Sequence, residues 1–194
     1  MFCCQCGHSL LSGAHFCTAC GAKVASVEVD YNSLQKINQL MCLEGKPFTG
    51  TGIARYAGGQ KKHQETFKNG LADGRWCYWY ENGEKAQEIH YHLNQLHGKE
   101  IEWYENGQKK SELHWRAGVL EGLWLSWYEN GQKEGEVQYQ NGKKHGVETL
   151  WYESGQIYSK GHWHHGQQTG HWTIWLPNGQ KKWEGDWQAY DVWV

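Results

Sequence analysis

Four cysteines near the N-terminus have the spacing of a metal site. Cys3 and Cys6 form one C-x-x-C pair, and Cys17 and Cys20 form a second. Two residues between thiolates allow a tight turn to direct both sulfurs at one ion, and two such turns complete the tetrahedral four-sulfur shell that zinc favours. Because such a shell leaves no position for water, we predict one structural Zn²⁺ per chain at these four residues, not a catalytic centre.

Two other uses of these cysteines are weaker. A disulfide framework would need export, but the cysteine-rich segment begins at residue 3, where the apolar region of a signal peptide would lie. A redox dithiol would need one C-x-x-C pair on a strand-to-helix unit, whereas this segment has two pairs in a short, loop-rich stretch. We therefore expect a cytoplasmic protein. The segment also resembles the zinc ribbons of many bacterial proteins, with F-C-x-x-C-G at 2–7 and again at 16–21.

Paired histidines are the second candidate for metal chemistry. His90-x-His92 and His162-x-His164 each place two imidazoles on one face of a strand, which is part of the shell in some zinc enzymes. The alternative is a solvated polar face, which we favour because no carboxylate follows either pair at ligand spacing.

Catalytic motifs are missing from the sequence. It has no nucleophile elbow, phosphate-binding loop or H-E-x-x-H pattern. One glutamate recurs beside each predicted turn and is interpreted as a solvated scaffold residue: Glu81, Glu105, Glu129 and Glu153. We predict that the chain is not an enzyme and has no catalytic residues.

A 24-residue period organises most of the chain. Tyrosine recurs at this spacing from Tyr56 to Tyr152, and glycine from Gly59 to Gly179. A unit this short cannot bury a core alone, so it must stack on its neighbours. We predict a zinc ribbon at 1–22, a linker at 23–38, a half-repeat at 39–50 and six repeats at 51–74, 75–98, 99–122, 123–146, 147–170 and 171–194.

Each repeat has the pattern of two strands. Alternating residues at 75–80 lead to the turn Glu81-Asn82-Gly83, and the chain returns through 84–91. Asn-Gly between alternating runs predicts a two-residue type I′ turn. A second turn recurs at Asn69-Gly70, Ala117-Gly118, Asn141-Gly142 and His165-Gly166. Two-residue loops at both turns would give a period of about 22, so either the strands drift or the second turn is longer.

The predicted fold is therefore all-β: an elongated single-sheet array of stacked antiparallel β-hairpins behind a small zinc ribbon. One face collects Trp76, Tyr78 and Tyr80, and the other holds Trp79. Lysines such as Lys85 are expected opposite the tyrosine column, where a cation–π contact contributes roughly 0.5–1 kcal/mol. The candidate partner-binding residues are Trp79, Trp103, Trp127, Trp151, Trp175, Tyr80, Tyr104, Tyr128 and Tyr152.

Charge does not select a partner. Lysine and arginine number 19 against 21 acidic residues, which leaves no basic field for nucleic acid or an anionic membrane. Thirteen Trp and eleven Tyr are more than a core of this size needs. Trp and Tyr are the usual anchors of protein interfaces, so the residues favour a protein-binding repeat scaffold.

The motif W-Y-E-N-G-Q-K-K at 103–110 and L-P-N-G-Q-K-K at 176–182 resemble the MORN-repeat variant family, as does G-K-P-F-T-G at 45–50. The resemblance implies a non-enzymatic binding module. Bacterial members are commonly assigned as antitoxins of toxin–antitoxin modules, so it also implies a toxin as partner. Other MORN proteins are described as scaffolds or lipid-associated modules. Two alternatives stay open: binding of phospholipid head groups, and nucleic-acid binding through the zinc ribbon.

Overall fold

The structure is a computed structural model and describes residues 27–187. The chain divides into two compact units, Met1–Gly83 with Tyr91–Gln95, and Glu84–His90 with Leu96–Val194. Residues of β9 (Lys85–His92) belong to both units. The predicted zinc ligands Cys3, Cys6, Cys17 and Cys20 lie outside the described residues.

The first unit contains one sheet built from repeat strands and a smaller sheet before them. Its elements are β1 (Glu28–Asp30), the 3₁₀ turn η1 (Tyr31–Ser33), β2 (Leu34–Ile37), β3 (Leu40–Leu43), β4 (Lys46–Pro47), β5 (Gly50–Arg55), β6 (Lys61–Lys68), β7 (Leu71–Ala72) and β8 (Gly74–Trp79). The larger sheet has the order β1-β5-β6-β8, with β7 beside β6, and β2-β3-β4 form the smaller one.

Part of the segment expected to be a linker has regular structure. β1, η1 and β2 all lie within 23–38, and β1 pairs in parallel with β5, placing Val29 opposite Gly52. The half-repeat at 39–50 supplies β3 and β4 and the edge of β5, and β3 also pairs with β2. β1, β2 and β4 have two to four residues each, which is too short for an alternating pattern to identify them in the sequence.

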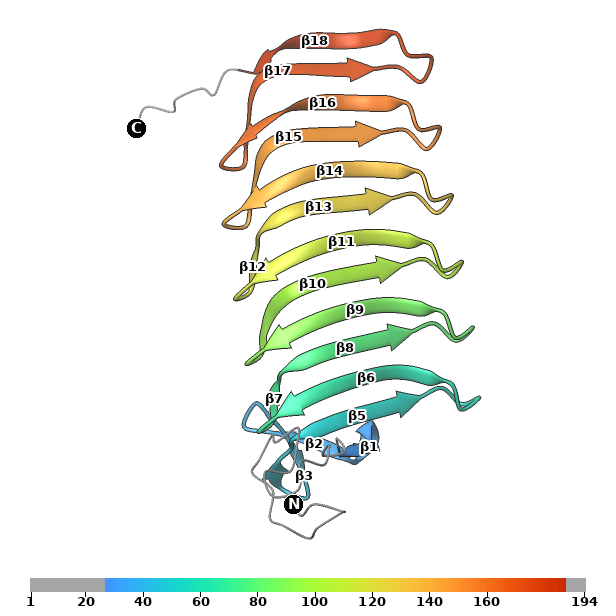
Figure 1. Cartoon of the computed structure of the whole chain (residues 1–194), viewed down its shortest axis with the longest axis vertical. Helices are drawn as coiled ribbons and strands as arrows, with labels where there is room; N and C mark the ends of the chain where they lie inside the picture. The colour runs from blue at the N-terminus through green and yellow to red at the C-terminus, as the bar shows by residue number, and fades with distance from the viewer. Residues whose placement is uncertain (1–26, 188–194) are drawn as a thin grey trace, which may run out of the picture. The chain divides into compact units, whose positions relative to one another are not determined.

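In the second unit the repeats form a sheet of antiparallel hairpins, in the order β10-β11-β13-β14-β15-β16-β17-β18, with β12 beside β11 (Figure 1). The strands are β10 (Gln95–Trp103), β11 (Lys109–Arg116), β12 (Val119–Leu120), β13 (Gly122–Trp127), β14 (Lys133–Gln140), β15 (Lys143–Trp151), β16 (Ile157–His164), β17 (Gln167–Trp175) and β18 (Lys181–Trp187). The predicted all-β class with many antiparallel hairpin strands is confirmed.

The turn after each tyrosine is not the predicted type I′ turn. The Gly107 amide donates to Tyr104 O at 2.9 Å, and the Tyr104 amide donates to Gln108 O at 2.8 Å. Positive φ occurs at Gly107 (81°) but not at Asn106. This is a type I turn followed by a left-handed glycine bulge, which suits a longer loop. Asn106 Oδ1 accepts the Gln108 amide at 2.9 Å and fixes the turn.

The second turn is the one with type I′ geometry. Both central residues have positive φ there, as in Asn141 (51°) and Gly142 (76°). The turn at Leu93 and Asn94 has the same signs of φ, 49° and 65°, although it has no glycine. Two positive φ angles match the right-handed twist of the strands that this turn joins.

A glycine bulge accommodates the two extra residues of the period. Val137 pairs with Glu148, but the next residue pairs with His145, so two residues of β15, Gly146 and Val147, are inserted. Gly146 has a φ of 78°, which favours glycine. Leu125 pairs with Glu136, which pairs with Thr149, the position 24 residues after Leu125. Equivalent strands are therefore level, and the second connection is the longer one.

Side chains of neighbouring strands bury one another. Val137 is fully buried, and Trp172 covers Gly161, where an added Cβ would lie 1.9 Å from the Trp172 ring. In the first unit Phe67 is 4% exposed and packs against Trp76, with ring centroids 5.4 Å apart. Between residues 27 and 187, no helix has the length and apolar character to span a membrane.

Candidate functional site

The repeat tyrosines join successive hairpins. Each hydroxyl donates to the carbonyl of a tryptophan in the following repeat: Tyr104 to Trp127 at 2.9 Å, Tyr128 to Trp151 at 2.7 Å, and Tyr152 to Trp175 at 2.8 Å. The first unit has the same bond, from Tyr56 to Trp79 at 2.8 Å. The tryptophans of the candidate site are thus held through their own backbone.

A lysine of the preceding repeat lies over the rings of Trp79, Trp103, Trp127 and Trp151. In the second unit the lysine nitrogens lie 5.1 Å, 5.1 Å and 5.3 Å from the ring centroids for Lys85 over Trp103, Lys109 over Trp127, and Lys133 over Trp151. The expected placement of these lysines opposite the tyrosine column is wrong. A bulge at the end of β13 makes Trp127, not Tyr128, the pairing partner of Lys133.

A glutamate three residues after each lysine completes this arrangement, which we call the Lys–Glu–Trp ladder. The lysine nitrogens bind the carboxylates at 2.7 Å, 2.7 Å and 2.9 Å in the pairs Lys85–Glu88, Lys109–Glu112 and Lys133–Glu136. The ion pair holds the ammonium group above the ring, so the ring has a fixed position before any partner arrives.

Burial and charge shift several pKa values at the ladder. Burial alone would raise the pKa of Glu112, but hydrogen bonds from Lys109 and Lys99 lower it below the ordinary value of 4.5. Lys99 approaches the Glu112 carboxylate to 2.5 Å. Burial and the Glu134 carboxylate raise the pKa values of Tyr104 and Tyr128. The tyrosines thus stay neutral donors, and the ladder glutamate stays an anion.

The ladder changes at the fifth repeat. Ile157 occupies the lysine position and Lys160 the glutamate position. Ile157 and Tyr158 are 38% and 39% exposed, and Tyr158 packs on Tyr152 with ring centroids 5.1 Å apart. The surface next to Trp175 is therefore more apolar than the surface next to Trp103, Trp127 and Trp151.

The first unit has one similar lysine–tryptophan contact, and it also has a cavity. Lys61 lies 5.5 Å from the Trp79 ring centroid, with Gln64 in place of the glutamate.

The cavity of the first unit has a volume of about 450 Å³, and its lining includes Trp76, Tyr91 and the buried Glu65. Tyr78 donates to Glu65 at 2.9 Å. Aromatic walls around a carboxylate can hold a small cationic group.

Glu65 also affects the neighbouring Tyr31. Burial, together with the charge and a hydrogen bond of Glu65, raises the pKa of Tyr31 to about 12.

The histidines of the two predicted pairs contact different neighbours. His90 Nδ1 lies 3.0 Å from Lys99 O, and His92 Nδ1 lies 3.2 Å from Asp73 Oδ2. His164 instead lies near His145 and His165 in the second unit. Two further histidines therefore lie beside His164: His165 directly follows it in the sequence, and strand pairing supplies His145 from a neighbouring hairpin.

The structure places all the candidate partner-binding residues in the repeats. The tryptophans and tyrosines are half-buried in both units: Trp79, Trp103, Trp127, Trp151, Trp175, Tyr80, Tyr104, Tyr128 and Tyr152. Sequence reasoning missed the three ladder glutamates as members of the site. Their signal was the spacing of three residues after the recurring lysine.

Four segments of the chain match the MORN repeat variant, namely residues 72–92, 96–117, 120–141 and 144–165. They recur every 24 residues, and each contains a Tyr-containing turn with its two flanking strands. No curated protein matches the chain. MORN repeats are non-enzymatic modules that typically bind proteins or membranes. Over these four segments, successive repeats in the central part of the chain are similar to the MORN repeat variant.

Proposed function

We propose that this chain is a non-enzymatic scaffold that binds a protein partner through the Lys–Glu–Trp ladder and the adjoining tyrosines. The observation that carries this proposal is the repetition of one half-buried indole at Trp103, Trp127 and Trp151, each beneath a lysine nitrogen at 5.1–5.3 Å. Fixed aromatic rings lose little conformational freedom on binding, which is the property of strong interface anchors.

A protein suits this surface better than a membrane. Phospholipid head groups would require free lysines, but Lys85, Lys109 and Lys133 are each held by a carboxylate within 2.9 Å. The net charge of −2 also provides no attraction to an anionic bilayer or to nucleic acid. The ladder instead offers alternating apolar rings and satisfied ion pairs.

The resemblance to bacterial MORN repeat variant proteins suggests that the partner is the toxin of a toxin–antitoxin module. This finer role is tested by co-expression. If a gene beside that of this chain encodes a toxin, the chain should relieve its growth arrest and form a stoichiometric complex with it.

The binding surface is tested with the tagged full chain in its native cell. Replacement of Trp103, Trp127 and Trp151 by alanine should abolish capture of the stoichiometric protein that the unaltered chain retains. A milder variant changes Lys85, Lys109 and Lys133 to glutamine, which keeps the rings but removes the cations above them, and it should weaken capture.

The matched control changes exposed apolar residues of the same unit, Leu123 and Val147, to alanine. Capture that survives the tryptophan changes in a folded chain, or that the control abolishes equally, would move the interface away from the ladder. Recovery of lipid without protein would favour the membrane alternative.

We also propose that Cys3, Cys6, Cys17 and Cys20 bind one structural Zn²⁺. Four thiolates suit zinc, and such a site contributes directly to folding. Metal analysis of the Cys6→Ser chain should show one zinc fewer than the unaltered chain. An unchanged zinc content would contradict the assignment.

A further inference from the structure

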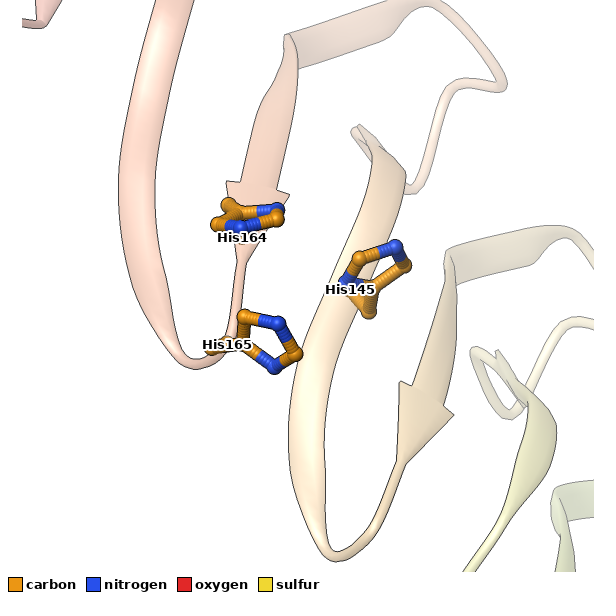
Figure 2. A group of neighbouring side chains, drawn as sticks. All are labelled: His145, His164 and His165. Atoms are coloured by element: carbon orange, nitrogen blue, oxygen red, sulfur yellow. The ribbon is translucent and has the colours of Figure 1, made fainter.

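Three histidines from two neighbouring hairpins meet in the second unit. His145 lies on β15, His164 ends β16, and His165 begins the turn that follows. One possible ligand nitrogen from each lies within 4.8 Å of the others. Figure 2 shows the three rings gathered between the two hairpins. We propose that His145, His164 and His165 bind a divalent transition-metal ion, with zinc, nickel and copper as the chemical class.

The rings need only small movements to share an ion. Their centroids are 5.3 Å apart for His145 and His164, 5.4 Å for His145 and His165, and 4.3 Å for His164 and His165. Metal–nitrogen bonds of about 2.0–2.1 Å place two ligand nitrogens of a tetrahedral site about 3.3 Å apart. His164 and His165 are exposed, so rotation of their side chains can close this difference.

The ligand set determines the type of ion. Neutral imidazole favours zinc, copper and nickel, whereas calcium and magnesium favour oxygen ligands. Three protein ligands leave at least one position for water or for a side chain of another molecule.

Comparison with the preceding repeat shows what the histidines replace. The residues 24 positions earlier are Glu121, Gln140 and Asn141. There the Glu121 carboxylate accepts the Asn141 amide at 2.9 Å and fixes the turn. At the later junction His145 takes the place of this carboxylate, and a cluster of imidazoles takes the place of a turn-stabilising hydrogen bond.

The environment of His145 leaves it available to a ligand. Its Nδ1 atom is buried and has no hydrogen-bond partner among the described residues. A buried polar atom without a partner is unfavourable, and this ring is not fixed by a competing acceptor. Strand alternation places the side chain of Lys144, which pairs with Glu148, on the opposite face of β15. That ammonium group therefore does not occupy the cluster.

The test uses the full chain, stripped of metal and kept reduced, and titrated with Zn²⁺ by calorimetry. The key variant combines His164→Gln with His165→Asn, which recreates the Gln140-Asn141 pair of the preceding repeat and so suits the turn. The matched control is His162→Gln, which removes an imidazole from the same strand outside the cluster. Cys6→Ser isolates the histidine site from the cysteine site.

The unaltered chain and the His162→Gln control should bind one more Zn²⁺ than the double variant, or bind it at least tenfold more tightly. Zinc binding to the Cys6→Ser chain should weaken as the pH falls, because protons compete with the metal ion for the ligand nitrogens. Zinc should also shift the imidazole NMR signals of His145, His164 and His165 in that chain. Equal stoichiometry and affinity in the double variant and the control would overturn the site, as would unshifted imidazole signals. Neither outcome bears on partner capture by the ladder.

Discussion

The tyrosine hydroxyls are small groups with a repeated structural effect. Tyr128 donates to Trp151 O at 2.7 Å, and this bond crosses from one repeat to the next. Tyr128→Phe should keep the ring packing and lower the free energy of unfolding by about 1 kcal/mol, the net value of one buried hydrogen bond. The urea midpoint measures this loss. Tyr158→Phe, at an exposed tyrosine, should have a smaller effect; equal losses would show that the cross-repeat bond contributes nothing special.

Glu112 should make stability depend on pH in acid. Its pKa is lowered by hydrogen bonds from Lys109 and Lys99 despite burial, so the folded chain binds this proton more weakly than the unfolded chain. Its stabilising effect is therefore present above the unfolded pKa and is lost as the pH falls through the folded pKa. Glu112→Gln should be less stable at neutral pH and lose less stability on acidification.

Urea midpoints from neutral pH to about pH 3 measure this difference. Glu129→Gln, at an exposed turn position, is the matched control and should follow the unaltered chain. A Glu112→Gln chain with the same acid dependence as the unaltered chain would contradict the prediction.

At the scale of elements, the second turn determines which residues each hairpin tolerates. Leu93 has a φ of 49° and is 52% exposed, whereas Asn69 and Asn141 occupy the same turn position elsewhere. Leucine is strained in the left-handed region, by roughly 1–2 kcal/mol, and asparagine less so. Leu93→Asn should therefore raise the thermal midpoint, and Asn141→Leu should lower it. If both variants changed the thermal midpoint in the same direction, backbone strain would be ruled out as the cause.

Close packing against a strand glycine is a second constraint at this scale. A Cβ at Gly161 would lie 1.9 Å from the Trp172 ring, so Gly161→Ala must displace the indole. We expect a loss of about 1–3 kcal/mol or more in the free energy of unfolding. Gly58→Ala is the control, because its added Cβ would meet only the movable end of Gln60. Similar midpoints for both variants would show that the indole moves without cost.

At the scale of the whole molecule, the chain should still fold after deletion of one complete 24-residue repeat, but not after deletion of half a repeat. Deletion of residues 123–146 joins equivalent positions of two repeats, so strand direction and register are preserved. This shortened chain should fold with a cooperative but lower thermal midpoint. Deletion of residues 123–134 should prevent folding of the second unit, because it removes one strand and its turn. Circular dichroism of both chains makes the comparison, and a well-folded half-unit deletion would contradict the repeat description.

The ends of the repeat array show where sequence reasoning is weakest. Before the first repeat, β1 pairs with β5, with Glu28 opposite Thr51. The parallel direction of that pair could not be foreseen. A three-residue strand has too few residues to show a period, so its place depends on the edge that accepts it.

The sequence by itself determined the period, the strand-turn-strand unit, the all-β class and the tyrosine and tryptophan columns, because these follow from local turn chemistry and alternation. Only the tertiary structure decided the details that depend on neighbouring strands. The glycine bulge at Gly146 aligns equivalent strands, and the bulge before Trp127 pairs Lys133 with Trp127 in place of Tyr128. Likewise, pairing of β15 with β16 brings His145 to His164. Such contacts join residues far apart in sequence, and a one-residue change of register is enough to create or remove them.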